Sequence, residues 1–234
     1  MVELFKEIIE LQDKLNSKID PNWKTNRDLE DWVIATNQEF AELMDSFPWA
    51  WWKKQSKIDI NNIKLELVDI FHFILSFAIQ GAYLIEVDKE ELAHFINFQA
   101  SKLLQVHPFN PRAMMKLYRE MLFEMELFIT HKDKVYLDLY FGTFFEMVET
   151  VGMSVSEFSK LYFGKNALNQ VRKDFGYDKG EYIKILWNGK EDNEVMMELI
   201  EDLEPSFDVI YKALRNYYET YVYTPENPEC FYEY

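Results

Sequence analysis

The chain has 234 residues, and 41 acidic residues against 25 Lys and Arg give it a formal net charge of −16. This charge argues against non-specific binding to nucleic acid or to an anionic membrane, because both attract basic surfaces. The single cysteine, Cys230, excludes an intrachain disulfide and is expected to be incidental. The amphipathic N-terminus is unlike a signal peptide, and no apolar run reaches membrane-spanning length. We therefore expect a cytoplasmic protein with no membrane or nucleic-acid partner.

Hydrophobic periodicity predicts a chain built of helices. Apolar residues recur at helical spacing from Leu4 to Leu15 and predict a first helix over 2–18, which is broken at Pro21. The same periodicity predicts further helices over 27–46, 60–80, 88–105, 111–130, 133–151, 154–170, 193–203 and 206–221. Asp59 is expected to cap the helix that starts at residue 60, with Gly81 near the end of that helix.

The helical pattern, the low content of glycine and proline (seven of each) and the lack of strand-like alternation predict an all-α fold, a compact helical bundle. We expect residues 1–234 to form a single domain. A rigid core with a mobile lobe stays open as a second form of this arrangement. The tail over 224–234 contains two prolines and is expected to be extended.

Two acidic pairs are candidates for a metal site. Glu39 and Glu42 are three residues apart, as are Glu66 and Asp69, so each pair occupies one face of its helix. The second pair lies in 63–79, which is apolar nearly all round and is therefore predicted to be buried. Buried carboxylates need cations, and four converging carboxylates suit Mg²⁺ held against a substrate phosphate. The alternative, that these are solvated surface carboxylates, is open because acidic pairs recur by chance in so acidic a chain.

Segment 164–194 is the clear concentration of basic residues in this acidic chain. Lys165, Asn169 and Arg172 recur at positions i, i+4 and i+7, which places them on one stripe of a helix. Lysine and arginine on such a stripe suit phosphate oxygens, which arginine can bind with two parallel hydrogen bonds. The alternative is a basic helix paired with acidic neighbours.

Five blocks of sequence, in this order, resemble the dimeric, all-α dUTPase family. They lie at 11–16, 32–53, 66–73, 165–177 and 182–193. The wider relatives are the all-α nucleoside triphosphate pyrophosphatases, which share two acidic pairs of this spacing. The resemblance implies that Glu39, Glu42, Glu66 and Asp69 bind Mg²⁺, and that Glu42 positions and deprotonates the attacking water.

The resemblance also implies a set of substrate-binding residues. It assigns phosphate contacts to Lys165, Arg172 and Lys184, a sugar or phosphate contact to Asn169, uracil contacts to Gln12 and Asn16, and further substrate contacts to Lys53, Tyr177 and Asn193. Trp51, Trp52 and Phe73 are expected either to wall the base and sugar or to be plain core aromatics. Asp192 belongs to the same closing segment as Asn193, without an assigned role. His72 follows Asp69 by three residues but is expected to be a core histidine with a backbone partner, since Mg²⁺ prefers oxygen ligands.

The function implied by the resemblance is Mg²⁺-dependent hydrolysis of dUTP, and of dUDP, to dUMP with release of pyrophosphate or phosphate, in a homodimer. Residues 86–150 match no motif and are expected to supply packing, a dimer surface or part of a mobile lobe. Two alternatives stay open. One is a related pyrophosphatase with another base preference, such as dCTP or a broad range, and the other is a helical binding module without catalysis.

Overall fold

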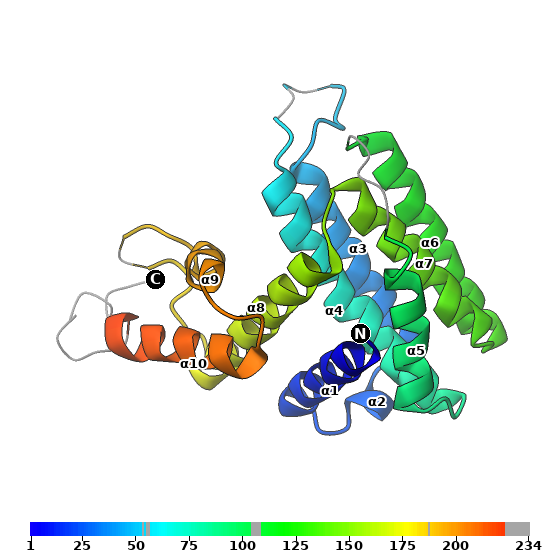
Figure 1. Cartoon of the computed structure of the whole chain (residues 1–234), viewed down its shortest axis with the longest axis horizontal. Coiled ribbons are helices and arrows are strands. Elements are labelled where there is room, and N and C mark those ends of the chain that lie inside the picture. The colour runs from blue at the N-terminus through cyan, green and yellow to red at the C-terminus, as the bar shows by residue number, and fades with distance from the viewer. Residues whose placement is uncertain (53, 55–56, 104–108, 187, 223–234) are drawn as a thin grey trace. The chain divides into compact units, whose positions relative to one another are not determined.

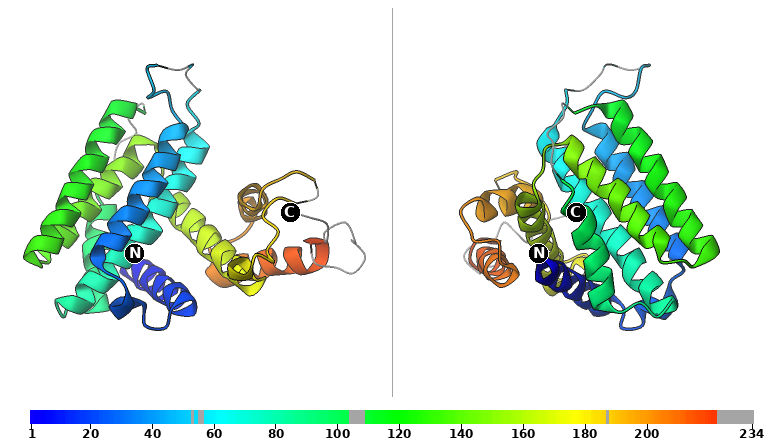
Figure 2. Two further views of the ribbon diagram at one scale, coloured as in Figure 1. Left: turned by 180° about the vertical axis from the view of Figure 1, so that it is seen from behind. Right: turned by 45° about the vertical axis from the view of Figure 1, so that its right-hand side comes forward.

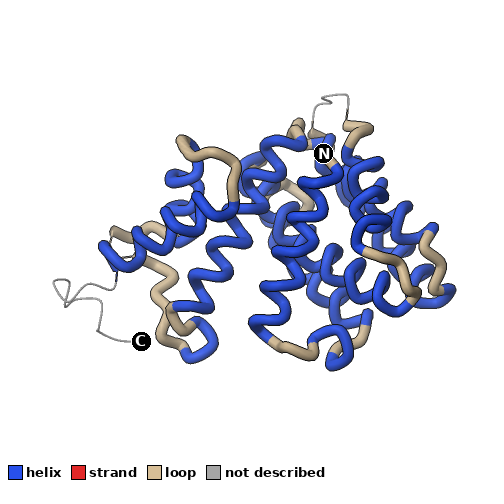
Figure 3. Tube along the Cα trace, turned by 60° about the horizontal axis from the view of Figure 1, so that its bottom comes forward, coloured by secondary structure: helices blue, strands red, loops and turns tan. Residues whose placement is uncertain are grey.

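The computed structural model describes residues 1–52, 54, 57–103, 109–186 and 188–222 (Figure 1). The chain forms two compact units, Met1–Phe158 and Ser159–Tyr234, and each is described by itself. Figure 3 shows helices joined by loops, and the described residues contain no strand. The predicted all-α fold is therefore confirmed. The expected extended tail over 224–234, including Cys230, lies outside the described residues.

Seven helices belong to the first unit within its described part. They are α1 (Val2–Ile19), α2 (Trp23–Asn26), α3 (Leu29–Asp45), α4 (Ile60–Leu84), α5 (Lys89–Ala100), α6 (Pro111–His131) and α7 (Val135–Thr150). α3 packs along α4, and α6 packs along α7 (Figure 2). The two pairs meet where α3 contacts α6 and α4 contacts α7, which makes a four-helix arrangement. α1 packs against α4 and α5, and α5 also packs against α4 and α7.

α4 is the central helix of the first unit. Of its 25 residues, 15 are buried, and its inner side chains include Leu67, Ile70 and Phe71. By length and composition alone α4 could cross a membrane, but 78% of its most apolar window is buried inside the protein. Such burial is expected of a helix at the centre of a bundle. The rings of Phe144 and Phe158 pack around Phe71, so an aromatic cluster fills this part of the core.

The observed helix ends agree with the predicted ends only in part. The Asp59 carboxylate accepts a hydrogen bond from the backbone N–H of Asn62 at 3.0 Å, which confirms the predicted cap of α4. The expected break after the first helix instead contains the short helix α2, whose Trp23 is buried. α5 ends at Ala100, five residues before the predicted end at 105. Periodicity locates such ends poorly because terminal turns depend on capping and on packing.

Gly81 lies near the end of α4, as expected, but the helix continues past it to Leu84, four residues beyond the predicted end at 80. A Cβ atom at this position would lie 2.6 Å from Cε1 of Phe128, a buried residue of α6. The missing side chain therefore allows the Phe128 ring to rest on the backbone of α4. Tertiary packing, not helix termination, explains this glycine.

We expect Gly81→Ala to lower the free energy of unfolding by about 1–3 kcal/mol, because the added methyl group overpacks a closed contact. The higher helix propensity of alanine, about 1 kcal/mol, offsets part of this loss. Urea unfolding measures the change. Gly142→Ala on α7 is the matched control, because its Cβ would meet the flexible side chain of Gln99 at 3.1 Å. A Gly81→Ala protein as stable as the control would contradict the packing role.

The second unit contains most of α8 (Val155–Asp174), followed by α9 (Asp192–Glu201) and α10 (Phe207–Tyr217). A 3₁₀ turn at Tyr177–Lys179 follows α8, and a π-helical turn at Tyr218–Val222 follows α10. Gly164 allows close packing of α8 on α9, since a Cβ there would lie 3.1 Å from the sulfur of Met196. The loop between α8 and α9 carries much of the basic segment predicted to bind phosphate.

Candidate active site

Three carboxylates from two packed helices meet in the first unit. Glu39 and Glu42 project from α3 and Glu66 from α4, and one oxygen of each lies within 4.8 Å of the others. We call these three residues the carboxylate cluster. Glu39 and Glu66 are partly buried, and Glu42 is exposed. The spacing of three residues on α3 therefore brings Glu39 and Glu42 to a common point with Glu66, as the sequence predicted.

The surroundings of the carboxylate cluster offer amide donors. Asn62 donates to Glu66 at 3.4 Å and to the Ser46 hydroxyl at 2.7 Å, and Gln38 donates to Glu42 at 3.1 Å. Such neutral donors offset only part of the repulsion among three like charges at this separation. An all-oxygen set of this kind fits a hard divalent cation such as Mg²⁺. The residues present thus suit the metal that the resemblance implied.

Asp69 does not join the carboxylate cluster at the same separation. It is partly buried on α4, nearly one turn beyond Glu66. Its side chain is one methylene shorter than that of glutamate, which limits its reach toward α3. The expected convergence of four carboxylates is therefore met by three, and the role of Asp69 as a metal ligand stays a prediction.

A cavity of about 230 Å³ lies in the same unit. Its lining includes Asn16 of α1, Trp32 of α3 and Phe73 of α4, and the Trp32 and Phe73 rings are 6.3 Å apart between centroids. Whole drug-sized ligands occupy cavities of about 300–1,000 Å³, so this one suits a single ring system rather than a whole nucleotide. The sequence predicted contacts of Phe73 and Asn16 with the nucleotide base, whereas it did not single out Trp32 as a residue that lines the base site.

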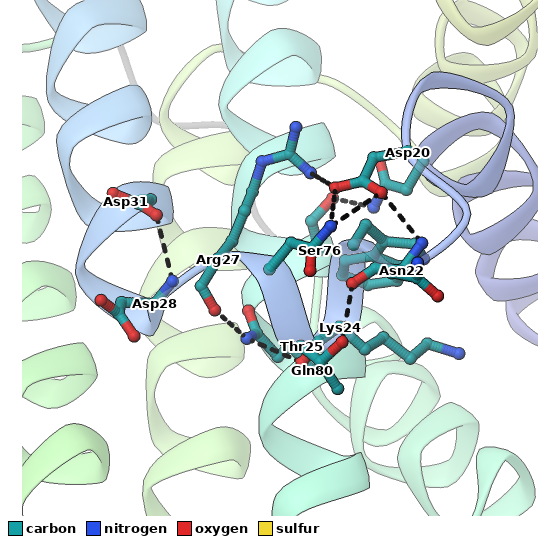
Figure 4. A network of polar contacts seen from close by, with 12 residues as sticks. Asp20, Asn22, Lys24, Thr25, Arg27, Asp28, Asp31, Ser76 and Gln80 are labelled. Carbon is teal, nitrogen blue, oxygen red and sulfur yellow. Dashed lines mark hydrogen bonds and ion pairs between the residues drawn. The ribbon is translucent and has the colours of Figure 1, made fainter.

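The segment between α1 and α3 contributes Arg27 to the lining of this cavity. Gln80 of α4 donates to the backbone carbonyls of Lys24 and Arg27 at 3.1 and 2.6 Å, as Figure 4 shows. Its own carbonyl oxygen accepts from the Trp32 indole at 2.6 Å. One buried amide therefore fixes both the loop and the aromatic wall to α4. Neither Arg27 nor Gln80 was expected from the sequence, because nothing local marks a contact across more than 50 residues.

The cavity and the carboxylate cluster share one face of the α3–α4 pair. Phe73 follows Glu66 by seven residues on α4, and Glu39 follows Trp32 by seven on α3. Seven residues make two helical turns, so each pair lies on one side of its helix, about 10.5 Å apart along the axis. A ligand with a ring in the cavity can therefore run along this face to the carboxylates.

The two amides predicted to meet uracil are buried and joined to each other. Gln12 donates to Asn16 at 3.1 Å, and both donate to the Ser76 hydroxyl, at 3.0 and 2.9 Å. His72 is buried, as expected of a core histidine, and its Nδ1 lies 2.7 Å from the Gln12 carbonyl oxygen. A side-chain amide thus stands where a backbone partner was expected. The contact of Gln12 and Asn16 with uracil stays a prediction.

The aromatic connector between α3 and α4 is exposed. The side chains of Trp51 and Trp52 are 84% and 60% exposed, and their rings contact each other with centroids 5.6 Å apart. The alternative of plain core aromatics is therefore wrong for these two residues, because the connector extends past the end of the packed helices. Their contact with substrate stays a prediction. Lys53 lies outside the described residues.

In the second unit, Asp192 fixes Arg172. The Asp192 side chain is fully buried and accepts from Nε and Nη2 of Arg172 at 2.8 and 2.9 Å. Nη1 of Arg172 donates to Asn169 at 3.1 Å. Tyr182 also donates to Asp192 at 3.0 Å, and burial together with the Asp192 charge raises the Tyr182 pKa, so this hydroxyl keeps its proton. Asp192, which had no role assigned from the sequence, is the central acceptor of this group.

The other predicted phosphate ligands differ in exposure. Lys165 is buried on α8 and donates to Asn193 at 3.0 Å, whereas Lys184 is exposed and lies 3.8 Å from Glu191. Tyr177 is exposed. The pairing of Arg172 with Asp192 agrees with the alternative of a basic helix with an acidic neighbour. Phosphate contacts, and a position opposite the carboxylate cluster, stay predictions for these residues.

An all-α fold with an acidic oxygen cluster and an aromatic cavity on one helical face has the features of a nucleotide hydrolase. The family model described as dUTPase matches residues 4–177, and the chain belongs to this all-α dUTPase family. It is accordingly an enzyme that hydrolyses dUTP. The match includes the carboxylate cluster, the cavity and α8, and ends before Lys184 and Asp192. No curated protein matches the chain.

Proposed function

We propose that this enzyme hydrolyses dUTP to dUMP and pyrophosphate, and dUDP to dUMP and phosphate, with Mg²⁺ as its cofactor. The carboxylate cluster carries the proposal, because three carboxylate oxygens within 4.8 Å of one another form an all-oxygen set that suits a hard divalent cation. The shared face of α3 and α4 adds support, since a base in the cavity directs the phosphates toward that cluster.

Each acidic residue has a distinct part in the proposed reaction. Glu39 and Glu66, the partly buried members, would hold Mg²⁺ together with Asp69. Bound Mg²⁺ supplies positive charge against the phosphate oxygens. Glu42, the exposed member, takes a proton from water as the water oxygen bonds to phosphorus and the bond between the α and β phosphates breaks. Lys165, Arg172 and Lys184 would bind the departing phosphate portion.

We also propose a homodimer that works in the cytoplasm. Support for a self-associating surface comes from large apolar side chains on α5, α6 and α7. Phe98, Phe123, Val135 and Leu139 are exposed there, within the 86–150 region that matches no motif. Sedimentation equilibrium measures the mass in solution. A monomer at all micromolar concentrations would contradict this part of the proposal.

A nucleotide panel tests the function. We expect dUTP and dUDP to be hydrolysed with Mg²⁺ and not with EDTA, and dCTP, dTTP and UTP to be hydrolysed at least about a hundredfold more slowly. Phosphorus NMR identifies the products as dUMP with pyrophosphate or phosphate. Equal rates for dCTP would favour the broader pyrophosphatase considered from the sequence. Full activity in EDTA would contradict the metal site. The non-catalytic module is wrong for a member of a hydrolase family.

A further inference from the structure

Four buried polar side chains form a closed hydrogen-bond network beside the cavity. Gln12 and Asn16 are one turn apart on α1, and His72 and Ser76 are one turn apart on α4. All four are at least nine-tenths buried. Of the four, Asn16 lines the cavity. The other three are therefore placed to act on the cavity through Asn16.

Ser76 determines the direction of the hydrogen bonds. Its oxygen lies 2.7 Å from the backbone carbonyl of His72, so its only proton is donated there. The Ser76 lone pairs must then accept, and they face the amide nitrogens of Gln12 and Asn16 at 3.0 and 2.9 Å. A hydroxyl used in this way cannot also donate to an amide oxygen.

Gln12 is fully engaged inside the network. Its two N–H groups point to Ser76 and to the Asn16 carbonyl oxygen, and its own oxygen lies 2.7 Å from His72 Nδ1. Because that oxygen can only accept, His72 carries a proton on Nδ1. Gln12 thus has no N–H left for a base and acts on its neighbour instead.

The orientation of the Asn16 amide follows from these contacts. Reversing it would set two donor nitrogens of Asn16 and Gln12 against each other at 3.1 Å. It would also set the Asn16 oxygen against a Ser76 oxygen that has no proton to give. Leaving buried polar groups so mismatched costs about 1–3 kcal/mol for each group. Asn16 is therefore held with its nitrogen toward Ser76 and its oxygen toward Gln12.

We propose that Ser76 and Gln12 are positioning residues that determine base specificity by fixing the Asn16 amide. Asn16 retains one N–H and one oxygen lone pair beyond the network. This pair matches the O4 acceptor and N3–H donor of uracil. Cytosine presents the reverse pattern at the same ring positions and needs the reversed amide, which the network forbids. This inference rests on the proposed preference for dUTP and names the residues that enforce it.

The test is the ratio of kcat/KM for dUTP to kcat/KM for dCTP in Ser76→Ala. Without the hydroxyl oxygen, one of the two mismatches that oppose the reversed Asn16 amide is removed and only the one with Gln12 is left, so we expect this ratio to fall at least about tenfold. The fall should come from slower dUTP hydrolysis with dCTP unchanged or faster. A purely structural defect would lower kcat/KM for dUTP and for dCTP by the same factor and leave their ratio unchanged. That result would overturn the proposal.

Thr36→Val is the matched control. Thr36 is equally buried in the same unit, and its hydroxyl also donates to the carbonyl four residues earlier, that of Trp32, at 2.8 Å. It takes no part in the network, so the ratio should stay at the wild-type value. Gln12→Met, which keeps the volume and removes the amide, replaces Ser76→Ala if thermal melting shows that the alanine protein is unfolded. A wild-type ratio in a folded Gln12→Met protein would likewise overturn the proposal.

Two failures are distinguishable. If the wild-type enzyme hydrolyses dCTP as fast as dUTP, the proposed preference itself is wrong. If the wild-type enzyme prefers dUTP and folded Ser76→Ala keeps that preference, only the positioning role is wrong.

Discussion

We expect Glu66→Gln to lower kcat for dUTP by at least about a thousandfold and to leave the fold intact. Glutamine keeps the shape of the side chain but removes one of three charges that meet within 4.8 Å. Loss of a group that stabilises transition-state charge typically costs about 100- to 1,000-fold, and loss of a metal ligand also weakens cofactor binding. Steady-state kinetics at saturating Mg²⁺ measures the effect.

The same substitution is expected not to lower the thermal stability of the metal-free protein. Removing one of three negative charges reduces the electrostatic repulsion within the carboxylate cluster. The melting temperature of Glu66→Gln in EDTA should therefore be equal to or higher than that of the wild type. The rise in melting temperature on adding Mg²⁺ with nucleotide, expected for the wild type by mass action, should shrink. Glu126→Gln, on an exposed part of α6, is the control and should keep both activity and the Mg²⁺ response. Full activity in Glu66→Gln would reject the metal assignment.

The second large effect is expected at the Arg172–Asp192 pair. Asp192→Ala leaves the Arg172 guanidinium, whose side chain is 17% exposed, without its acidic partner. Breaking a buried pair from one side costs about 3–5 kcal/mol, because an uncompensated charge stays behind. Chemical unfolding followed by far-UV circular dichroism should show this loss. An unchanged unfolding free energy would contradict the central position of Asp192.

A double substitution separates stability from catalysis at this pair. In Arg172→Met/Asp192→Leu both charges are replaced by apolar side chains of similar volume, so most of the stability should return. The KM for dUTP should nevertheless stay raised, and binding of dUMP should be little affected, because the proposed role of Arg172 is at the distal phosphates. Equal losses for dUTP and dUMP would argue against that role.

Local patterns predicted the fold and part of the site. The apolar stripe of α1 and the nearly all-apolar run of α4 indicated two helices whose core packing the structure confirms. The spacing of Glu39 and Glu42 likewise placed both on one face of α3. These predictions succeed because helical periodicity follows from backbone geometry, which is the same in every helix.

Other features depend on contacts that periodicity does not encode. Ser76 and Gln80 look like ordinary polar residues in an apolar helix, and their roles arise from partners more than 50 residues away. Asp192 drew attention only as part of a resembling block, because its burial depends on α8 and Tyr182. The difference between Glu66 and Asp69 in reach toward α3 likewise depends on how closely two helices pack.

The seven-residue spacings on α3 and α4 set the distance between the site for the base and the site for the phosphates. The same two helices position both the base site and the phosphate site, which are about 10.5 Å apart along the helix axis. One residue inserted into α4 between Glu66 and Phe73 would rotate one end against the other by about 100°. The residues of the base site and those of the carboxylate cluster would all still be present, yet a single nucleotide could no longer contact both sites. A substitution at one end would change a single contact with the substrate, whereas a change in the number of residues between the two ends would separate the base site from the phosphate site.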